Sequence, residues 1–492
     1  MPLKITMQDI RARHPKGLNS PTDFYYMNLA NRLLTITGQS LMSTELTQEM
    51  RQRIALCVTL YFEDVICDCG IWRSFIAKNH EFYGRRLPFY DTPDDYLPDE
   101  PYLEDVKLVV WDAIMAFKYE SVVNPENMGL TLLAEQLYHV IDGEFERAPV
   151  NEALSDYFRE CRFMDDFYHM RDALKFFVLS CYLTNGRHIE GYLKYQIESA
   201  MQLIDQPDLA YYEAECVMAW QYRIGPLALL PEEWLGMALR AVGRCSEADE
   251  VEAIKWRDYE PYLVEQYDAD GFTLRSIDDE QLRLTHHKMA QKDDSTVKKH
   301  DFTLAMFAKY RGEWYLNGPA SWGNGERIFN EVRDNTQKTH NPGLPNFETV
   351  VKENDGSPLF YFNDIREAMS FMNKVTRAAF KGKMPEGWDK DDKDVVFFLS
   401  PTNHIFAMAP GAAECICDPR NPYYNKQKAT ERALLLVVQN AVPGEMLRYL
   451  IKHDMLPDAC LKSTVSPEHG RLLMQKNLDF FARTLRRDDY HK

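Results

Sequence analysis

The sequence predicts an α+β protein, in which an all-helical N-terminal half is followed by an α+β C-terminal half with a mainly antiparallel sheet. Two patterns support this. Apolar side chains recur every three or four residues through the first half, as on the buried faces of helices. From about residue 256, short aromatic and β-branched segments alternate with turn sequences. The 492-residue length favours two or three domains, and we place a helical domain at residues 1–255 and an α+β domain at residues 256–492.

The N-terminal half opens with a helix that begins at Thr22-Asp23 and a longer one over residues 44–69. The best-marked helix follows an acidic, proline-containing loop and spans residues 101–117. Its first residue is a proline, which suits the first helical turn because the missing N–H would have no partner there. The charges of Glu104 and Asp105 are favoured near the same end by the helix dipole. Further helices are expected at residues 130–141, 150–161, 163–183, 191–204, 208–219 and 231–242.

The C-terminal half contains hairpin signals. The clearest joins residues 302–310 and 314–318 across Arg311-Gly312-Glu313, and another surrounds Asp268-Ala269-Asp270-Gly271. The remaining strands are expected at residues 262–267, 272–277, 281–289, 395–400, 404–408 and 414–417. Helices are expected at residues 364–380, 430–438, from the break at Pro443-Gly444 to residue 453, and 467–485.

The composition is that of a soluble globular protein with a sizeable core. Hydrophobic residues make up 45% of the chain and charged residues 27%. No apolar run approaches the ~18 residues of a membrane-spanning helix, and the N-terminus lacks the apolar segment of a signal peptide. The ten cysteines are scattered, mostly in apolar segments, as reduced buried thiols are. We therefore expect a cytoplasmic protein that does not enter a membrane.

The net charge and the motifs of the sequence argue against two classes of function, namely non-specific nucleic-acid binding and cofactor binding. The formal net charge of −18 argues against non-specific nucleic-acid binding, which needs a basic surface. The chain has neither the glycine pattern of a dinucleotide site nor a lysine-containing phosphate loop, so we expect no cofactor. The sequence does not determine an oligomeric state.

One group of acids and histidines has the spacing of a metal site. Glu135 with His139, and Asp166 with His169, are separated by three or four residues and would share a helical face. Paired helices with such Glu/Asp–His motifs hold di-iron sites in helical bundles. The match is loose, because the residue one position after Glu135 is glutamine. The alternative interpretation is that these side chains form the solvated faces of surface helices.

A second group combines a cysteine and a histidine. Cys415 lies near His404, and such a pair can form a thiolate nucleophile or take part in a zinc site. However, Cys415 and Cys417 are separated by one residue, which is not the usual zinc spacing, and in a strand they would face opposite sides. The alternative is that both cysteines behave as small hydrophobic residues.

Short motifs of aromatic, acidic and turn residues occur along the chain. They are Asp23-Phe24-Tyr25-Tyr26 with Leu29-Ala30-Asn31, Leu87 to Asp91 with Asp99-Glu100, Glu104-Asp105 and Trp111, Gly312-Glu313-Trp314 with Asn317-Gly318, Asn421-Pro422-Tyr423-Tyr424-Asn425, and Asn477-Leu478-Asp479-Phe480-Phe481-Ala482-Arg483. Together they resemble a family of bacterial proteins classed only as a domain of unknown function. The resemblance spans nearly the whole chain. It implies a bacterial cytoplasmic origin and supplies no activity or site residues.

The aromatic content favours an interaction or scaffold protein. The chain has 27 Tyr and 26 Phe, residue types that serve both core packing and partner recognition. A groove that binds a protein partner is expected at Tyr310, Trp314, Tyr315, Trp322, Tyr423 and Tyr424. The alternative is a hydrolase that depends either on a metal at Glu135, His139, Asp166 and His169 or on the Cys415–His404 pair.

Overall fold

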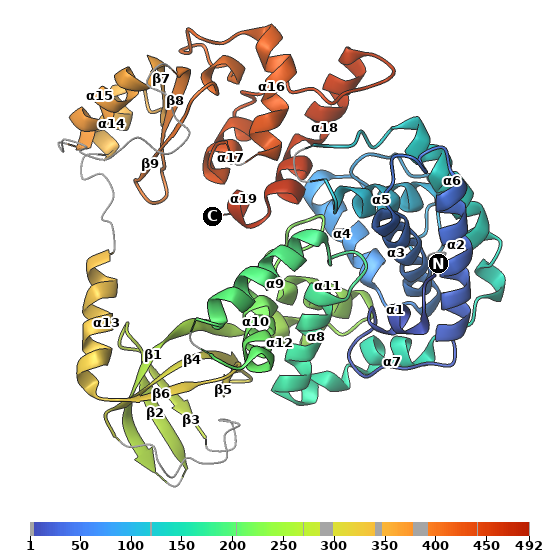
Figure 1. The fold of residues 1–492 in the computed structure, drawn as a ribbon, viewed down its shortest axis with the longest axis horizontal. Coiled ribbons are helices and arrows are strands. Elements are labelled where there is room, and N and C mark those ends of the chain that lie inside the picture. The colour runs from blue at the N-terminus through green and yellow to red at the C-terminus, as the bar shows by residue number, and fades with distance from the viewer. Residues whose placement is uncertain are drawn as a thin grey trace. The chain divides into compact units, whose positions relative to one another are not determined.

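The computed structural model describes residues 4–118, 121–202, 204–268, 270–285, 299–339, 347–376, 392–439 and 441–491 (Figure 1). The chain forms two compact units. The first comprises Met1–Phe117, Gly129–Gly225 and Leu229–His340, and the second comprises Lys118–Met128, Pro226–Ala228 and Asn341–Lys492. The second unit therefore takes two short segments from within the sequence of the first.

The first unit begins with helices packed around α3, Gln48–Cys67. α3 starts after Thr47, whose hydroxyl accepts a hydrogen bond from the Met50 N–H (3.2 Å). Every side chain from Ile54 to Val65 is buried, as in a helix that lies inside a core. α3 contacts α2, α4, α5 and α7. The helices up to residue 252 are α1 (Met7–Arg11), α2 (Asp23–Gln39), α3, α4 (Ile71–Tyr83), α5 (Leu103–Met115), α6 (Met128–Asp142), η1 (Phe145–Arg147), α7 (Glu152–Glu160), η2 (Arg162–Asp165), α8 (Phe167–Leu179), α9 (Arg187–Ala200), α10 (Pro207–Gln221), α11 (Pro231–Ala241) and α12 (Cys245–Glu252).

An antiparallel sheet of six strands completes the first unit. Its strands are β1 (Lys255–Asp268), β2 (Gly271–Arg275), β3 (Gln281–Leu284), β4 (Asp301–Tyr310), β5 (Glu313–Leu316) and β6 (Ser321–Asn324). The hydrogen-bonded order is β3-β2-β1-β4-β5, and β6 also pairs with β4. β3 and β5 lie at opposite ends of this order and yet contact each other, so the sheet curls. Helix α13 (Glu326–Thr339) contacts β1 and β4.

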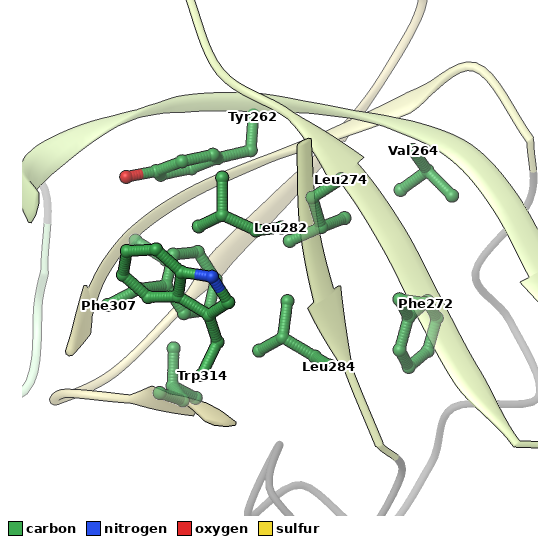
Figure 2. Packing of buried hydrophobic residues seen from close by; sticks show 10 residues of the cluster. Tyr262, Val264, Phe272, Leu274, Leu282, Leu284, Phe307 and Trp314 are labelled. Atoms are coloured by element: carbon green, nitrogen blue, oxygen red, sulfur yellow. The ribbon is translucent and has the colours of Figure 1, made fainter. Parts of the chain in front are cut away.

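The curled sheet encloses its own core, which Figure 2 shows from close by. Alternate residues of each strand point into it, as the two-residue period of a strand requires. Tyr262 on β1 and Phe307 on β4 meet edge to face, with ring centroids 4.8 Å apart. The buried members are Tyr262, Val264, Phe272, Leu274, Leu282, Leu284, Ala305, Phe307, Trp314 and Leu316.

The second unit contains a smaller sheet and a group of helices. Its antiparallel sheet has the order β7-β8-β9, formed by β7 (Leu359–Asp364), β8 (Lys393–Leu399) and β9 (Phe406–Ala409). Helix α15 contacts β7 and β8, and Phe397 lies in the core between them with Met372. The helical elements are α14 (Phe347–Glu353), α15 (Ile365–Thr376), η5 (Ala413–Cys415), α16 (Lys426–Val438), α17 (Gly444–Lys452), α18 (Pro467–Arg486) and α19 (Asp488–His491).

The two inserted segments are bonded into the second unit. Asn124 donates to the Lys462 carbonyl (3.2 Å), and Glu126 lies 3.0 Å from His469 Nε2. The carbonyl of Pro226 accepts a hydrogen bond from the buried hydroxyl of a threonine in α18 (2.5 Å).

The predicted fold class is confirmed. The N-terminal half is helical, and the C-terminal half contains antiparallel sheets together with helices. The change of pattern near residue 256 coincides with the start of β1 at Lys255. The sheet that begins there belongs to the same compact unit as the preceding helices. The independence of residues 1–255 and 256–492 as domains stays a prediction.

Two elements of the structure differ from the secondary structure that the sequence pattern predicts. The helix predicted over residues 163–183 is divided into η2 and α8, because the Asp166 carboxylate accepts from the Tyr168 N–H (2.8 Å) and so caps a new helix. The strand predicted over residues 414–417 is replaced by the turn η5. There the Asn421 side chain donates to the carbonyls of Ala413 (2.6 Å) and Ile416 (2.7 Å), which holds a tight turn in place of an extended strand.

Candidate functional site

The aromatic residues expected at a groove in the first unit serve its packing. Trp314 is buried in the core of the first sheet (Figure 2), and Trp322 packs against the same core. Tyr310 is buried, and its hydroxyl donates to a carbonyl of η2. Tyr315 points to the other face and stacks on Phe167 of α8, with ring centroids 4.7 Å apart. These contacts attach β4 and β5 to the neighbouring helices.

The remaining two expected aromatics lie in the second unit. Tyr423 and Tyr424 are half-buried and precede α16. The Tyr424 hydroxyl donates to the carboxylate of Asp458. The six aromatics are therefore divided between the two units, and a partner-binding role for them stays a prediction.

The four residues considered as metal ligands lie on separate elements. Glu135 and His139 are on α6, whereas Asp166 and His169 are at the start of α8. Asp166 caps α8, and the His169 side chain is 73% exposed and 3.9 Å from the Asp166 carboxylate. Within the described parts of the chain, no three His, Cys, Asp or Glu side chains are grouped so that they could hold a metal ion.

The cysteine–histidine pair lies in the second unit. Cys415 is buried in η5, and burial raises the pKa of its thiol to about 11. A thiol of such pKa is almost entirely protonated at neutral pH, whereas nucleophilic cysteines have lowered pKa values. The ring of His404 stacks on Phe347, with ring centroids 4.2 Å apart.

We expect Cys415 to react slowly with thiol reagents. In the folded protein at pH 7.5, iodoacetamide should alkylate the exposed Cys245 first, because Cys415 is both buried and protonated. Peptide mass spectrometry over a time course would measure both rates. Alkylation of Cys415 as fast as that of Cys245 would contradict this expectation.

A cavity of about 950 Å³ lies in the first unit between α4, α11 and α12. This volume is typical of small-ligand sites. Close packing of α4 against α11 depends on a glycine. A Cβ on Gly70, at the start of α4, would lie 2.9 Å from the Cβ of Ala241. The apolar part of the wall is formed by Ala77, Leu230, Met237 and Ala241.

Most charged side chains that line this cavity have partners of opposite charge. Lys78 pairs with Glu81 (2.8 Å), and Arg240 pairs with Glu252. Arg73 lies 2.9 Å from an aspartate carboxylate and donates to the Ala241 carbonyl. Glu233 accepts from the backbone N–H of the residue that precedes α11 (2.7 Å) and lies 3.3 Å from an arginine.

The carboxyl of Glu232 differs from the other charged groups that line this cavity. Glu232 is the second residue of α11 and lines the cavity, and its buried Oε2 has no hydrogen-bond partner among the residues that the structure describes. Burial raises the pKa of Glu232 to about 7. A shifted carboxyl in a cavity is a candidate functional group, because it can accept a donor or exchange a proton near neutral pH.

Two other carboxyls with raised pKa values have complete sets of partners. Burial raises the pKa of Asp64 to about 6 and that of Asp105 to about 7. Asp64 accepts from two backbone N–H groups at the start of α4 and from the hydroxyl of Tyr182. Asp105 accepts from the hydroxyls of Tyr61 (2.8 Å) and Tyr96 (3.0 Å). These two carboxylates bind helices to one another inside the core.

The sequence patterns did not distinguish Glu232. Two glutamates after Pro231 form an ordinary helix start, where acidic residues are favoured. Glu233, the third residue of α11, caps the helix start by accepting from the Leu230 N–H, whereas Glu232 lies where α4 and α12 pack against α11. Local sequence encodes the first of these positions but not the second.

Within the described residues, no helix has the length and apolar character needed to cross a membrane. The chain matches the family model described as "Protein of unknown function (DUF3843)" over residues 4–311 and 320–487. No curated protein and no solved structure shows a significant match. The expected membership of an uncharacterised family is thus confirmed: the chain belongs to the DUF3843 family of proteins of unknown function.

Proposed function

We propose that this protein is a cytoplasmic interaction protein and that the cavity between α4, α11 and α12 binds a basic side chain of a partner protein. The observation that carries the proposal is Glu232, a carboxyl with a raised pKa that lines a cavity and forms no ion pair with the described residues, whereas the other charged side chains of the cavity are paired. A bound ammonium or guanidinium group would give this carboxylate a partner of opposite charge.

The rest of the cavity suits the same ligand. Lysine and arginine carry a charged head on an apolar stem, which needs an apolar wall beside the acid. Leu230 and Met237 supply that wall. The formal net charge of −18 also favours the approach of a basic partner over an acidic one.

We expect the cavity to prefer charged over neutral peptides of the same shape. The probes are capped Ala-Leu-X-Leu-Ala peptides in which X is arginine or its uncharged isostere citrulline. The arginine peptide should bind the wild-type protein more tightly by calorimetry, and Glu232→Gln should weaken this binding about tenfold, a loss of about 1.4 kcal/mol. The affinity of the wild-type protein should rise from pH 6 to pH 8, because the carboxyl with a pKa of about 7 becomes charged over this range.

The control is Glu49→Gln, which removes an acid in the first turn of α3 that does not line this cavity. It should leave both affinities and their pH dependence unchanged. Equal binding of the two peptides, or an unchanged preference for arginine in Glu232→Gln, would disprove the proposal.

A further inference from the structure

A second cavity, of about 510 Å³, lies beside α3 in the first unit. α1 and α3 form part of its wall, and the end of α8 and the start of α9 complete it. Two arginines line it, Arg13 just after α1 and Arg53 on α3. No residue of the cavity described above is shared with it.

The two arginines converge on one residue. Arg13 Nη1 donates to the side-chain oxygen of Asn185 (2.8 Å), and Arg53 Nη2 donates to the backbone carbonyl of the same residue. Both donors are cations, and both acceptors are neutral. The two guanidinium groups are thus held close together by a neutral bridge.

Neither arginine is neutralised by the described part of the chain. No carboxylate of the described residues forms an ion pair with Arg13 or Arg53, in contrast to Arg11, which pairs with Asp23 at 2.7 Å. The Nε atom of Arg53 is buried and finds no hydrogen-bond partner in the described ranges of the chain. Burial and the adjacent charge of Arg53 lower the pKa of Arg13, which means that the pair of cations is unfavourable as it stands.

Acidic residues also line the cavity, but none of them forms an ion pair with Arg13 or Arg53 in the described part of the chain. The Asp9 carboxylate accepts from the backbone N–H and the hydroxyl of Thr6, both at 2.7 Å. Glu190 raises the pKa of Arg13 less than burial and Arg53 lower it. Glu49 lines the cavity and forms no ion pair with either arginine. The remaining wall is largely apolar, formed by Leu56, Leu60, Phe117 and Leu179.

We propose that Arg13 and Arg53 bind the oxyanion group, a phosphate or a carboxylate, of a small organic molecule whose apolar part lies against Leu56, Leu60 and Phe117. The proposal does not depend on the function proposed for the other cavity. Guanidinium groups present planar pairs of N–H donors that match these anions. An anion would neutralise two adjacent cations.

A purely structural role is the competing explanation. Asn185 donates to the carbonyls of Val178 (3.2 Å) and Leu179 (2.9 Å) at the end of α8, so the arginines could simply fix this residue. That role predicts a loss of stability on mutation and no response to anions. Ligand titration separates the two explanations.

The test is a titration of the full chain with phenyl phosphate, hexanoate, inorganic phosphate and, as a neutral control, phenol. Phenyl phosphate or hexanoate should bind saturably and raise the melting temperature, whereas phenol should not. The tighter of the two anions identifies the class of oxyanion. Arg53→Gln should weaken binding at least tenfold. The matched control Arg51→Gln lies two residues earlier on α3 and lines a different cavity, so it should leave binding unchanged.

If circular dichroism shows that Arg53→Gln does not fold, Arg53→Lys serves in its place, because it keeps the charge and loses the planar pair of donors. It should weaken binding severalfold. The proposal is overturned if neither organic anion saturates, or if Arg51→Gln weakens binding as much as the substitution at Arg53.

Discussion

Replacing Asp105 by alanine should lower the free energy of unfolding by about 2–6 kcal/mol, because two buried hydroxyls would each lose an acceptor at about 1–3 kcal/mol. Asp105 is fully buried on α5 and accepts from Tyr61 and Tyr96. The Trp72 indole N–H donates to the Tyr96 hydroxyl (3.3 Å), so the loss extends to α4. Urea denaturation followed by circular dichroism would measure the change.

The pH dependence provides a second readout. Burial raises the pKa of Asp105 to about 7 in the folded protein, compared with about 3.9 in an unfolded chain. The folded state therefore keeps a proton that the unfolded state has released. The stabilisation from this proton is complete below about pH 4 and is lost as the pH rises through 7, by up to about 4 kcal/mol.

Asp105→Asn is the matched control, because asparagine keeps the shape and an acceptor oxygen but does not titrate. As the pH rises from 4 to 7, the free energy of unfolding of the wild-type protein should fall relative to that of Asp105→Asn. Parallel stability curves over this range would show that the Asp105 carboxyl has an ordinary pKa.

Replacing Arg486 by methionine should destabilise the second unit by about 3–5 kcal/mol, because three backbone carbonyls would lose a charged donor. The Arg486 side chain is 1% exposed and its Nε donates to the Asp489 carboxylate (2.9 Å). Its other nitrogens donate to the carbonyls of Leu436 (3.0 Å), Gln439 (3.1 Å) and Val442. These carbonyls lie at and after the end of α16, where the last carbonyls of a helix lack intrahelical partners.

The same helix offers a control. Arg471 on α18 forms an ion pair with Glu468 three residues away, and the Glu468 side chain is 64% exposed. Arg471→Met should change stability by about 0.5 kcal/mol or less, because such surface pairs contribute little. Hydrogen exchange measured by mass spectrometry would report on α16–α18 separately from the first unit. Unchanged protection of α16 in Arg486→Met would contradict the expected capping role.

α5 illustrates how much of the fold local sequence determines. Periodicity and the proline-acid start predict a helix over residues 101–117, and the structure has α5 at Leu103–Met115. The same pattern assigns Glu104 and Asp105 one role at the helix end. In the structure only Asp105 enters the core, because Tyr61 of α3 and Tyr96 of the preceding loop provide donors there. Partners so distant in sequence leave no local signal.

The alternation of side chains along a strand predicts which face of the sheet each aromatic residue of β5 points to. In β5, Trp314 and Leu316 point into the sheet core, and Tyr315 points outward to α8. A two-residue period predicts this division. The alternation does not predict which helix packs on each face of the sheet. That packing decides whether an aromatic side chain forms part of a binding surface or of a buried contact. The same reasoning does not identify the candidate site. Glu233 takes a local capping position by accepting from the Leu230 N–H (2.7 Å), but the burial of Glu232 depends on the helices packed around it.

The segments Lys118–Met128 and Pro226–Ala228 have a consequence for biosynthesis. On the ribosome both are translated well before residues 341–492, with which they form their unit. The nascent chain must therefore hold Asn124, Glu126 and Pro226 without their final partners until α18 emerges. A fragment that ends at residue 340 would contain these two segments without the rest of their unit. The two units are therefore interleaved in the sequence and are not two consecutive domains joined by a linker.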